Sequence, residues 1–424
     1  MLYNTLRGFA EMERAILVGL DLGHSADFQN SMAELDSLAK ALSIKVVGVY
    51  TQKADFPTPN FYIGQGKVEI LKQDIMTLDA NLLIFDDELS PSHIRNLEKE
   101  LEIKIVDRTI LILDIFAKRA RTKEAMLQVE LAQATYFLPR IVGMYRSLSR
   151  QKSGTGSKGP GEQQLELDRR VLRDQIARTK RELKDVVANR RTQRNKRRQA
   201  SIKTVAIAGY TNSGKSTLMN SILTETKSKS EKYVFEKNML FATLETQTRE
   251  VRPEHNRNFV ITDTVGFISK LPHNLIEAFK STLEEVKEAD LILHVVDVAN
   301  PNYQKQMAVV EEVLKEIGVA DIPIINVFNK IDLVPSPPLE TDGPPVYISA
   351  LQNTNINILL DRIDKELYPK IKINNFLIPF AEGQIYSFLK SNANIMETSY
   401  SEKGINLKVE LTENLLQRFA KYIV

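Results

Sequence analysis

One segment constrains this chain more than any other: the loop Gly209-Tyr210-Thr211-Asn212-Ser213-Gly214-Lys215-Ser216. It follows an apolar run, Thr204–Ala208, and precedes a helix-forming run, Thr217–Leu223. A strand, a glycine-rich loop and a helix in this order are the context that a phosphate-binding loop requires. Its backbone N–H groups and the helix N-terminus would cradle a β-phosphate, so we expect the residues from Gly209 to Thr217 to bind a nucleotide.

Two motifs predict how the phosphates and a metal are held. Lys215 is expected to bridge the β- and γ-phosphates, and the Ser216 hydroxyl to bind Mg²⁺. Downstream, Asp263-Thr264-Val265-Gly266 follows the apolar strand Phe259–Ile261. An aspartate there holds the metal through water, and the glycine amide senses the γ-phosphate. The sequence therefore predicts Mg²⁺ as cofactor, with Lys215 and Gly266 among the catalytic residues.

The nucleotide base is indicated by Asn329-Lys330-Ile331-Asp332, which ends the apolar run Ile322–Phe328. Guanine presents two donors side by side, and the carboxylate of Asp332 can accept from both. Adenine would leave that carboxylate unsatisfied, at a cost of roughly 1–3 kcal/mol. We expect Lys330 to lie over the ring, Asn329 to tie loops together, and a backbone N–H of Ser349-Ala350 to contact guanine O6. GTP is therefore the expected substrate.

Two features of the catalytic region concern the reaction itself. A threonine between the two phosphate motifs should reach Mg²⁺ and the γ-phosphate, and the candidates are Thr243, which we favour, and Thr248. Many GTPases place a glutamine directly after the glycine of the second motif to orient water, but this chain has Phe267. Because phenylalanine cannot hydrogen-bond water, slow intrinsic hydrolysis and activation by a partner are expected.

Strand-like and helix-like segments alternate along most of the chain, which predicts parallel sheets and an α/β fold. We expect an N-terminal α/β domain over 1–109, a long antiparallel helical hairpin over 110–200, a P-loop GTPase domain over 201–370 and a small α+β domain over 371–424. In the first of these, the glycine-containing segment Phe61–Lys67 either holds a phosphate or is a structural turn.

The second arm of the expected hairpin carries an excess of positive charge. Leu165–Ala200 contains thirteen Lys/Arg and five Asp/Glu, and the loop Ser149–Gly161 before it is rich in glycine. A solvated helix face normally mixes signs, so a folded RNA is the predicted partner, with a plain coiled-coil surface as the alternative. The expected RNA contacts are Arg150, Lys152, Lys158, Arg190, Arg191, Arg194, Arg197 and Arg198.

Composition excludes several other classes of protein. There is no cysteine, which rules out disulfides, thiolate metal sites and cysteine nucleophiles. No run reaches the roughly 18–20 apolar residues of a membrane span, and the N-terminal residues lack the order of a signal peptide. A cytoplasmic protein is expected. His93, His255 and His294 show no metal-ligand spacing and are expected to be structural.

Over roughly Phe61 to Leu389 the chain resembles the HflX family of translational GTPases, relatives of the Obg group. The resemblance is carried by Leu127–Gln133, Gly159–Glu162 with Gln164–Arg170, Phe241–Leu244 and Asp263–Phe267. It implies a GTPase whose partner is the large ribosomal subunit and its rRNA, with a hairpin that approaches the peptidyl transferase centre. It further implies splitting or rescue of stalled ribosomes and, in some members, protection from antibiotics.

The chain also departs from the family pattern. After Thr243-Leu244 the family usually has Asp-Pro-Thr, whereas this chain has Glu245-Thr246-Gln247. Lys152-Ser153 and Ser157-Lys158 replace part of the family's glycine run. An altered tip is compatible with an antibiotic-resistance paralogue. The alternatives are a GTP-switched assembly factor of the large subunit and an RNA-binding GTPase with a non-ribosomal target. Off the ribosome we expect a monomer.

Overall fold

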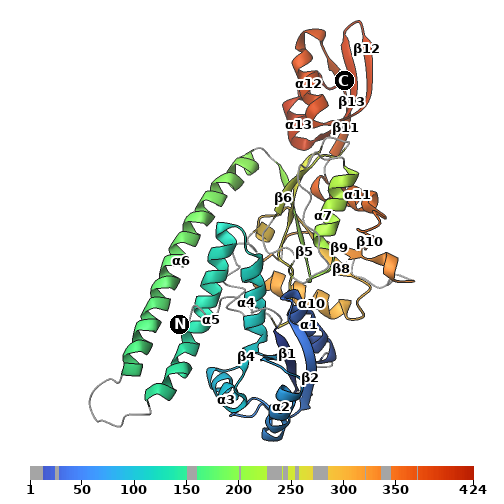
Figure 1. The fold of residues 1–424 in the computed structure, drawn as a ribbon. Coiled ribbons are helices and arrows are strands. Elements are labelled where there is room, and N and C mark those ends of the chain that lie inside the picture. Colours follow the sequence, from blue (N-terminus) through green and yellow to red (C-terminus); the bar gives the residue numbers. More distant parts are fainter. Residues whose placement is uncertain are drawn as a thin grey trace. The chain divides into compact units, whose positions relative to one another are not determined.

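The computed structural model describes residues 13–23, 28–149, 160–199, 202–226, 241, 247–253, 257–270, 285–319, 321–335, 345–369 and 371–424. The chain divides into two compact units, both built from strands and helices (Figure 1). The first comprises 1–191, 238–245 and 268–281, and the second comprises 192–237, 246–267 and 282–424. Within the ranges just given, no helix has the length and apolar character needed to cross a membrane.

A parallel sheet of order β2-β1-β3-β4 forms the centre of the first unit. Strand β3 is buried along its whole length, as expected for a strand covered on both faces. The alternation of strands and helices predicted from the sequence is confirmed. The elements are β1 (Arg14–Asp21), α1 (Phe28–Ala41), β2 (Lys45–Lys53), α2 (Gln65–Thr77), β3 (Leu82–Phe85), α3 (Pro91–Leu101), β4 (Lys104–Asp107) and α4 (Arg108–Arg119).

Polar caps fix where the helices of this sheet begin. Ser90 Oγ accepts from the backbone N–H of His93 at the start of α3, and Asp107 Oδ1 accepts from the N–H of Ile110 at the start of α4. In the N-terminal half of the segment 110–200, where the sequence predicted the first helix of a hairpin, the structure has two helices. Helix α4 ends at Arg119 because Ala120 is extended (φ −62°, ψ 121°), and α5 begins at Lys123.

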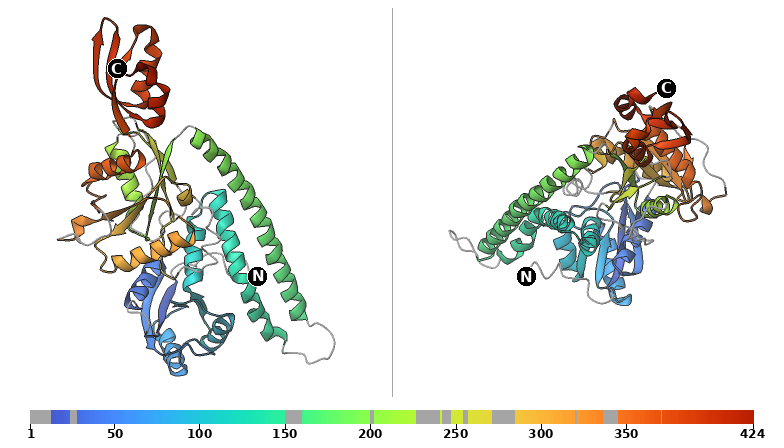
Figure 2. Two further views of the ribbon diagram at one scale, coloured as in Figure 1. Left: turned by 180° about the vertical axis from the view of Figure 1, so that it is seen from behind. Right: turned by 90° about the horizontal axis from the view of Figure 1, so that it is seen from above.

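The expected hairpin consists of α5 (Lys123–Ser149) and α6 (Pro160–Gln199). Glu130 accepts from Gln175 Nε2 at 2.7 Å, and Lys123 Nζ lies 3.9 Å from Glu182 Oε2. Because a lower number on α5 meets a higher number on α6, the helices run antiparallel, and both views of Figure 2 show them side by side. The antiparallel helical hairpin is therefore present as predicted.

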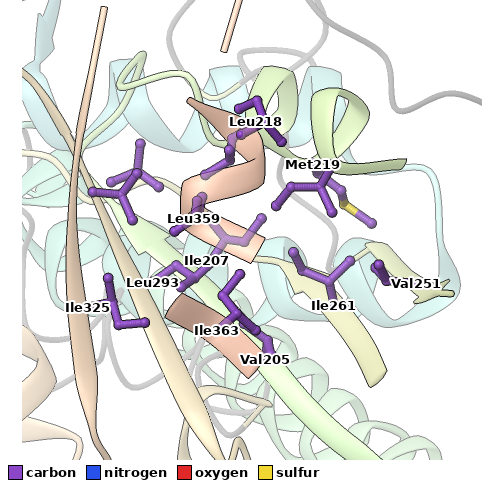
Figure 3. Packing of buried hydrophobic residues seen from close by; sticks show 14 of the residues in the cluster. Val205, Ile207, Leu218, Met219, Val251, Ile261, Leu293, Ile325, Leu359 and Ile363 are labelled. Carbon is purple, nitrogen blue, oxygen red and sulfur yellow. The ribbon is translucent and has the colours of Figure 1, made fainter. Parts of the chain in front are cut away.

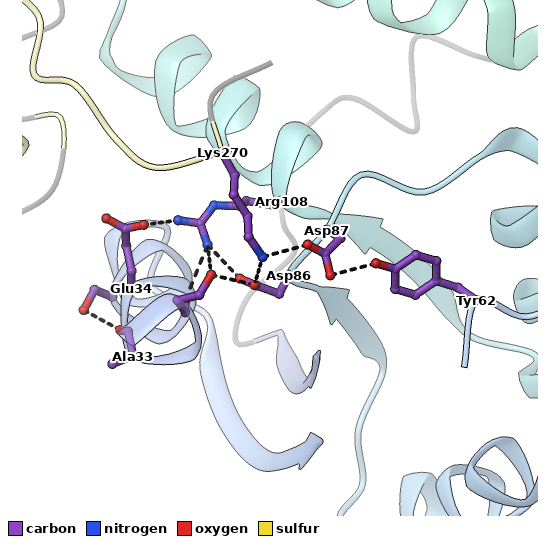
Figure 4. Close-up of polar contacts among 9 residues, drawn as sticks. Ala33, Glu34, Tyr62, Asp86, Asp87, Arg108 and Lys270 are labelled. Atoms are coloured by element: carbon purple, nitrogen blue, oxygen red, sulfur yellow. Dashed lines mark hydrogen bonds and ion pairs between the residues drawn. The ribbon is translucent and has the colours of Figure 1, made fainter. Parts of the chain in front are cut away.

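A buried polar network lies at the carboxyl end of β3 (Figure 4). The Arg108 guanidinium, almost fully buried, donates to Asp86 Oδ1 at 2.7 Å and also to Glu34. The Ser31 hydroxyl donates to the second oxygen of Asp86 at 2.6 Å. Burial acts to raise the pKa of Asp86, but the neighbouring cations outweigh it and hold that pKa below its usual value. Arg108 thus keeps a buried carboxylate charged.

Lys270 joins the same network from the segment 268–281, which belongs to this unit. Its ammonium group donates to Asp86 and, at 2.7 Å, to Asp87 Oδ1. The Tyr62 hydroxyl donates to Asp87 Oδ2 at 2.8 Å, and burial, reinforced by the nearby carboxylates, raises the pKa of Tyr62. The two adjacent aspartates therefore anchor a residue far away in the sequence.

The second unit contains a sheet of order β10-β9-β8-β5-β7-β6, parallel except for β6. On one face, Leu218 of α7 and Leu359 of α11 pack against strand residues such as Ile207 (Figure 3). On the other face, residues of α10 pack against Phe328. Alternate residues of the central strands serve opposite faces, as strand geometry requires. The elements are β5 (Lys203–Gly209), α7 (Lys215–Glu225), β6 (Gln247–Val251), β7 (Phe259–Asp263), β8 (Leu291–Asp297), α10 (Tyr303–Glu316), β9 (Ile324–Asn329), β10 (Val346–Tyr347) and α11 (Ile356–Leu367).

The small C-terminal α+β part is an antiparallel sheet of order β11-β13-β12 with two helices. The half-buried Arg257 donates to both carboxylate oxygens of Asp364 on α11 and to Glu410 on β13 at 2.8 Å. One guanidinium thus joins the C-terminal sheet to a helix of the larger sheet. The elements are β11 (Ile371–Ile378), α12 (Gly383–Asn392), β12 (Asn394–Ser401), β13 (Gly404–Thr412) and α13 (Glu413–Arg418).

Candidate nucleotide site

The glycine-rich loop lies at the carboxyl end of β5, an inner strand of the sheet, and leads directly into α7. Gly209 has φ +155°, and a Cβ atom there would come within 2.4 Å of the Val295 carbonyl oxygen. Gly214 has φ +93°, and a Cβ there would lie 2.2 Å from Asn329 Nδ2. Only glycine fits at either position, so the loop backbone is held tightly against the neighbouring strand ends.

Lys215, the first residue of α7, is buried, and its ammonium group points back into the loop. It donates to the carbonyl oxygens of Gly209 at 3.1 Å and Tyr210 at 2.8 Å. Burial, helped by the charge of Lys330 and opposed by Asp263, lowers the pKa of Lys215 to about 8. Within the described residues no carboxylate lies within ion-pair distance of this ammonium. A phosphate group would supply the missing negative charge.

The Ser216 hydroxyl donates to Asp263 Oδ2 at 2.6 Å. Ser216 stands in the first turn of α7, and Asp263 ends β7 and is fully buried. The sequence placed these two residues beside one metal ion, and the structure brings their oxygens together. A hydroxyl and a carboxylate at a loop that cradles phosphates are oxygen ligands of the kind that Mg²⁺ prefers, so the residues fit this metal.

The motif after β7 closes onto the loop through backbone contacts. The Thr211 N–H donates to the Phe267 carbonyl at 2.7 Å, and the Phe267 N–H donates to the Gly209 carbonyl at 3.1 Å. A Cβ on Gly266 would lie 2.9 Å from Thr211 Cα and 3.0 Å from Lys215 Nζ. The Phe267 ring itself is buried. Gly266 thus lies against the loop at the side where Lys215 emerges, and its contact with a γ-phosphate stays a prediction.

Asn329 ties two loops together, as the sequence predicted. Its Nδ2 donates to the Ser213 carbonyl at 2.9 Å, and its Oδ1 accepts from the Ala350 N–H at 2.9 Å. The Ala350 N–H, which we expected to contact guanine O6, is therefore bonded to Asn329 in this structure. The Ser349 N–H is bonded to the Thr354 carbonyl.

Lys330 and Asp332 lie just beyond the carboxyl end of β9. Lys330 Nζ donates to the Asn212 carbonyl at 2.9 Å and to Asp297 Oδ2 at 2.6 Å. Asp332 Oδ1 is shielded from solvent and has no hydrogen-bond partner among the described residues. A shielded, unpartnered carboxylate oxygen is costly, and paired purine donors would satisfy it.

The two candidates for the switch threonine are placed differently. Thr248 lies in β6, and its hydroxyl is 3.2 Å from that of Thr262 on β7. The Thr248 side chain therefore contacts the neighbouring strand of the sheet. Thr243 lies outside the described residues, so its expected contact with Mg²⁺ stays a prediction.

The predicted RNA contacts fall mostly outside what the structure describes. Arg150, Lys152 and Lys158 lie outside the described residues. Arg190, Arg191, Arg194, Arg197 and Arg198 lie on the helical backbone of α6, and only that backbone is described.

The two histidines within the described residues have structural surroundings. His294 on β8 is buried beside Asn326, and burial lowers its pKa to about 4. The His93 ring packs edge-on against Tyr62. His255 lies outside the described residues. Sequence reasoning missed Asp297, although its place as the polar residue ending an apolar strand was a usable signal.

A phosphate loop, a buried strand-end aspartate and a guanine-type motif on one mainly parallel sheet define a P-loop GTPase. Family models match residues 29–117 as "GTP-binding GTPase N-terminal", 119–197 as "GTP-binding GTPase Middle Region" and 204–330 as "50S ribosome-binding GTPase". The chain belongs to the HflX family of GTPases, and GTP is its substrate. The resemblance seen in the sequence is confirmed.

Individual relatives are similar along nearly the whole chain. GTPase HflX of Caldanaerobacter subterraneus is 45% identical over 98% of this chain and 94% of its own. GTPase HflX of Escherichia coli K12 is 37% identical over 94% of this chain and 93% of its own. Among solved structures, a GTP-binding protein from Sulfolobus solfataricus in complex with GDP is 28% identical, covering 84% of this chain and 99% of that one, with a TM-score of 0.43.

Proposed function

We propose that this GTPase binds the large ribosomal subunit near the peptidyl transferase centre and splits or rescues stalled ribosomes. The observation that carries the proposal is one of connectivity. The long basic helix α6 ends at Gln199, and β5, which begins at Lys203, leads straight into the phosphate loop. The family description matched by residues 204–330, a 50S ribosome-binding GTPase, supports this partner. A single strand, β5, therefore separates the phosphate loop from α6 along the chain.

In this proposal the phosphate loop binds the nucleotide through Gly209 to Thr217. Lys215, whose ammonium donates to two loop carbonyls and has no carboxylate partner among the described residues, contacts the β- and γ-phosphates, and Gly266 senses the γ-phosphate. Ser216 and Asp263 hold Mg²⁺, joined by Thr243. When bound, the ion neutralises charge on the transferring phosphate. Asp332 accepts hydrogen bonds from guanine. The Ala350 N–H, which is bonded to Asn329 Oδ1 in this structure, also donates to guanine O6 or leaves Asn329 to do so.

Hydrolysis by the isolated protein is expected to be slow. Phe267, at the position of the usual water-orienting glutamine, is buried, and its backbone is bonded to the phosphate loop. Rates near 10⁻⁴ s⁻¹ are typical of unassisted small GTPases, and ribosomes should raise the rate. Rapid turnover of about 1 s⁻¹ by the isolated protein would contradict this.

The RNA contacts are assigned to the α6 arginines Arg190, Arg191, Arg194, Arg197 and Arg198 and to Arg150, Lys152 and Lys158 at the tip. Phosphate contacts release counterions, so binding should weaken steeply as salt rises. The protein is proposed to work in the cytoplasm, where ribosomes are, and as a monomer when not bound to them.

Sedimentation of intact ribosomes tests the proposal. Ribosomes are mixed with the protein and GTP, GDP or a non-hydrolysable GTP analogue and then separated on a gradient. Splitting is expected with GTP and the analogue and not with GDP, and Lys215→Ala should abolish it together with nucleotide retention. A variant with the five α6 arginines changed to glutamine should bind less and show a flatter salt dependence.

Other results of the same experiment favour the alternatives. Binding to free large subunits with intact ribosomes unchanged would indicate an assembly factor. Affinity for small RNAs without ribosome stimulation of hydrolysis would indicate a non-ribosomal target. Protection from antibiotics is the narrower form of the proposal, and it requires that the protein restore translation on drug-treated ribosomes.

A further inference from the structure

The carboxyl ends of β8 and β9 bring two charged residues together beside the phosphate loop. Asp297, the last residue of β8, pairs in register with Asn329, the last residue of β9. Lys330 follows immediately, and its Nζ donates to Asp297 Oδ2 at 2.6 Å. Both side chains are mostly buried, with exposed fractions of 24% for Lys330 and 16% for Asp297. The ion pair is therefore shielded from solvent more than a typical surface pair.

The aspartate is itself held in place. Asp297 Oδ1 accepts from the backbone N–H of Ala299 at 3.1 Å, in the turn that follows β8. One carboxylate oxygen is thus fixed by the main chain while the other faces Lys330. A carboxylate fixed in this way offers its partner a single direction of approach.

Lys330 has a second fixed acceptor and an unusual backbone. Its Nζ also donates to the Asn212 carbonyl of the phosphate loop at 2.9 Å, and its φ is +67°, in the left-handed region. A lysine side chain has large rotamer freedom, and two acceptors that converge on one ammonium remove much of it before a ligand arrives. A side chain ordered in advance loses less entropy when the ligand binds.

Charge gives a second reason for the pair. Lys330 and Lys215 both donate to backbone carbonyls of the phosphate loop, Lys330 to Asn212 and Lys215 to Gly209 and Tyr210. Two ammonium groups at one small site repel each other, and Asp297 offsets the charge of one of them. The Asp297 carboxylate faces Lys330, whereas the Lys215 ammonium points into the phosphate loop. The negative charge of Asp297 therefore acts mainly on Lys330, at the base side of the site.

We propose that Asp297 is a positioning residue for the guanine subsite: it holds the Lys330 side chain extended over the place of the base and thereby sets the affinity for guanine nucleotides. The inference rests on the assignment of Lys330 to the base under the proposed function. Asp297 touches neither nucleotide nor metal in this role and acts through Lys330 alone.

A double-mutant cycle on the full chain tests this. Dissociation constants for GDP are measured by calorimetry for the wild type, Asp297→Asn, Lys330→Met and the double variant. Asp297→Asn should weaken GDP binding about tenfold, the scale of one charge-assisted hydrogen bond. Because Asp297 acts through Lys330, the double variant should bind no more weakly than Lys330→Met alone.

Pyrophosphate separates positioning from a structural role. It occupies the phosphate loop without a base, so Asp297→Asn should leave its affinity unchanged, whereas a disturbed loop would weaken pyrophosphate and GDP together. Asp361→Asn, which removes a carboxylate from an exposed position of α11, is the matched control and should change neither affinity.

Each outcome has a separate meaning. An Asp297→Asn variant that binds GDP like the wild type, or that loses the same factor again in the Lys330→Met background, overturns the inference. Parallel loss of pyrophosphate binding also overturns it. A Lys330→Met variant with unchanged GDP affinity defeats instead the assignment of Lys330 to the base, and with it that part of the proposed function.

Discussion

Lys270, three positions after Phe267, donates its ammonium protons to Asp86, a fully buried carboxylate of the loop after β3. The same ammonium binds Asp87. The backbone that follows the phosphate-sensing motif therefore ends in an ionic anchor within the first unit. Removing it leaves Asp86 with Arg108 and Ser31 as its remaining partners.

Lys270→Ala should lower the free energy of unfolding. Losing one partner of a buried carboxylate is costly, but Lys270 is 41% exposed, so we expect about 1–2 kcal/mol. The pKa of Asp86 is held below its usual value, so the contribution is present above the unfolded pKa and is lost as pH falls through the folded pKa. Urea unfolding at pH 7 and pH 3 should show the difference shrinking in acid. Lys40→Ala, at an exposed helix pair, is the control.

Asp114 on α4 gives a prediction of the opposite sign. Burial, with Glu13 nearby, raises the pKa of this carboxyl to about 7, although Lys104 opposes the shift. The folded state therefore binds a proton more tightly than the unfolded state, and stability falls as pH rises from about 4 to 7. Asp114→Asn should stabilise the protein by about 1 kcal/mol or more at pH 8 and by little at pH 4, since each pKa unit is worth roughly 1.4 kcal/mol. Equal effects at both pH values would contradict the shift.

Asp332→Asn should change base preference and leave phosphate binding intact. The amide of asparagine can donate to the C2 carbonyl of xanthine but cannot accept two guanine donors. We expect about ten- to hundredfold weaker GTP binding and improved XTP binding. Competition of both nucleotides against a fluorescent GDP analogue measures this. Loss of both nucleotides to the same extent would argue that Asp332 supports the loop instead of reading the base.

Arg257 joins the C-terminal sheet to α11, so its removal should destabilise the contact between them. Arg257→Ala removes one cation from two partly buried carboxylates, Asp364 and Glu410, so we expect a loss of about 2–4 kcal/mol. Arg252→Ala, in the same segment but in an exposed pair with Glu250, should cost about 0–1 kcal/mol. Thermal unfolding of the two variants side by side would show whether the difference is real.

The sequence predicted best where local pattern and chemistry agree. Gly209 and Gly214 stand where close backbone contacts require glycine, and the loop motif identified both. Asp263 and Asn329 each end an apolar strand, so their spacing from the loop was enough to identify them. Strands β6 and β12 were missed. Residues 247–251 are mostly polar, and most of β12 is exposed, so backbone pairing at a sheet edge holds these strands instead of apolar burial. A period-two pattern of apolar residues is absent from such strands.

Partnerships between distant residues could not be read from the sequence. Lys270 and Asp86 are separated by 184 positions, and the local sequence around either residue does not predict its contact with the other. Asp297 and Lys330 meet because β8 and β9 are neighbours in the sheet, which depends on strand order. The break between α4 and α5 at Ala120 could not be predicted either, because the backbone there becomes extended without a proline or glycine in the sequence.

The 40 residues of α6 have a mechanical consequence. At 1.5 Å per residue the helix is about 60 Å long, and it ends three residues short of the strand that carries the phosphate loop. For a rod of this length, a tilt of about 5° about one end corresponds to a displacement of about 5 Å at the other. The length of α6 therefore sets a scale: any tilt about its C-terminal end would displace its N-terminal end by far more than it displaces residues close to Lys203.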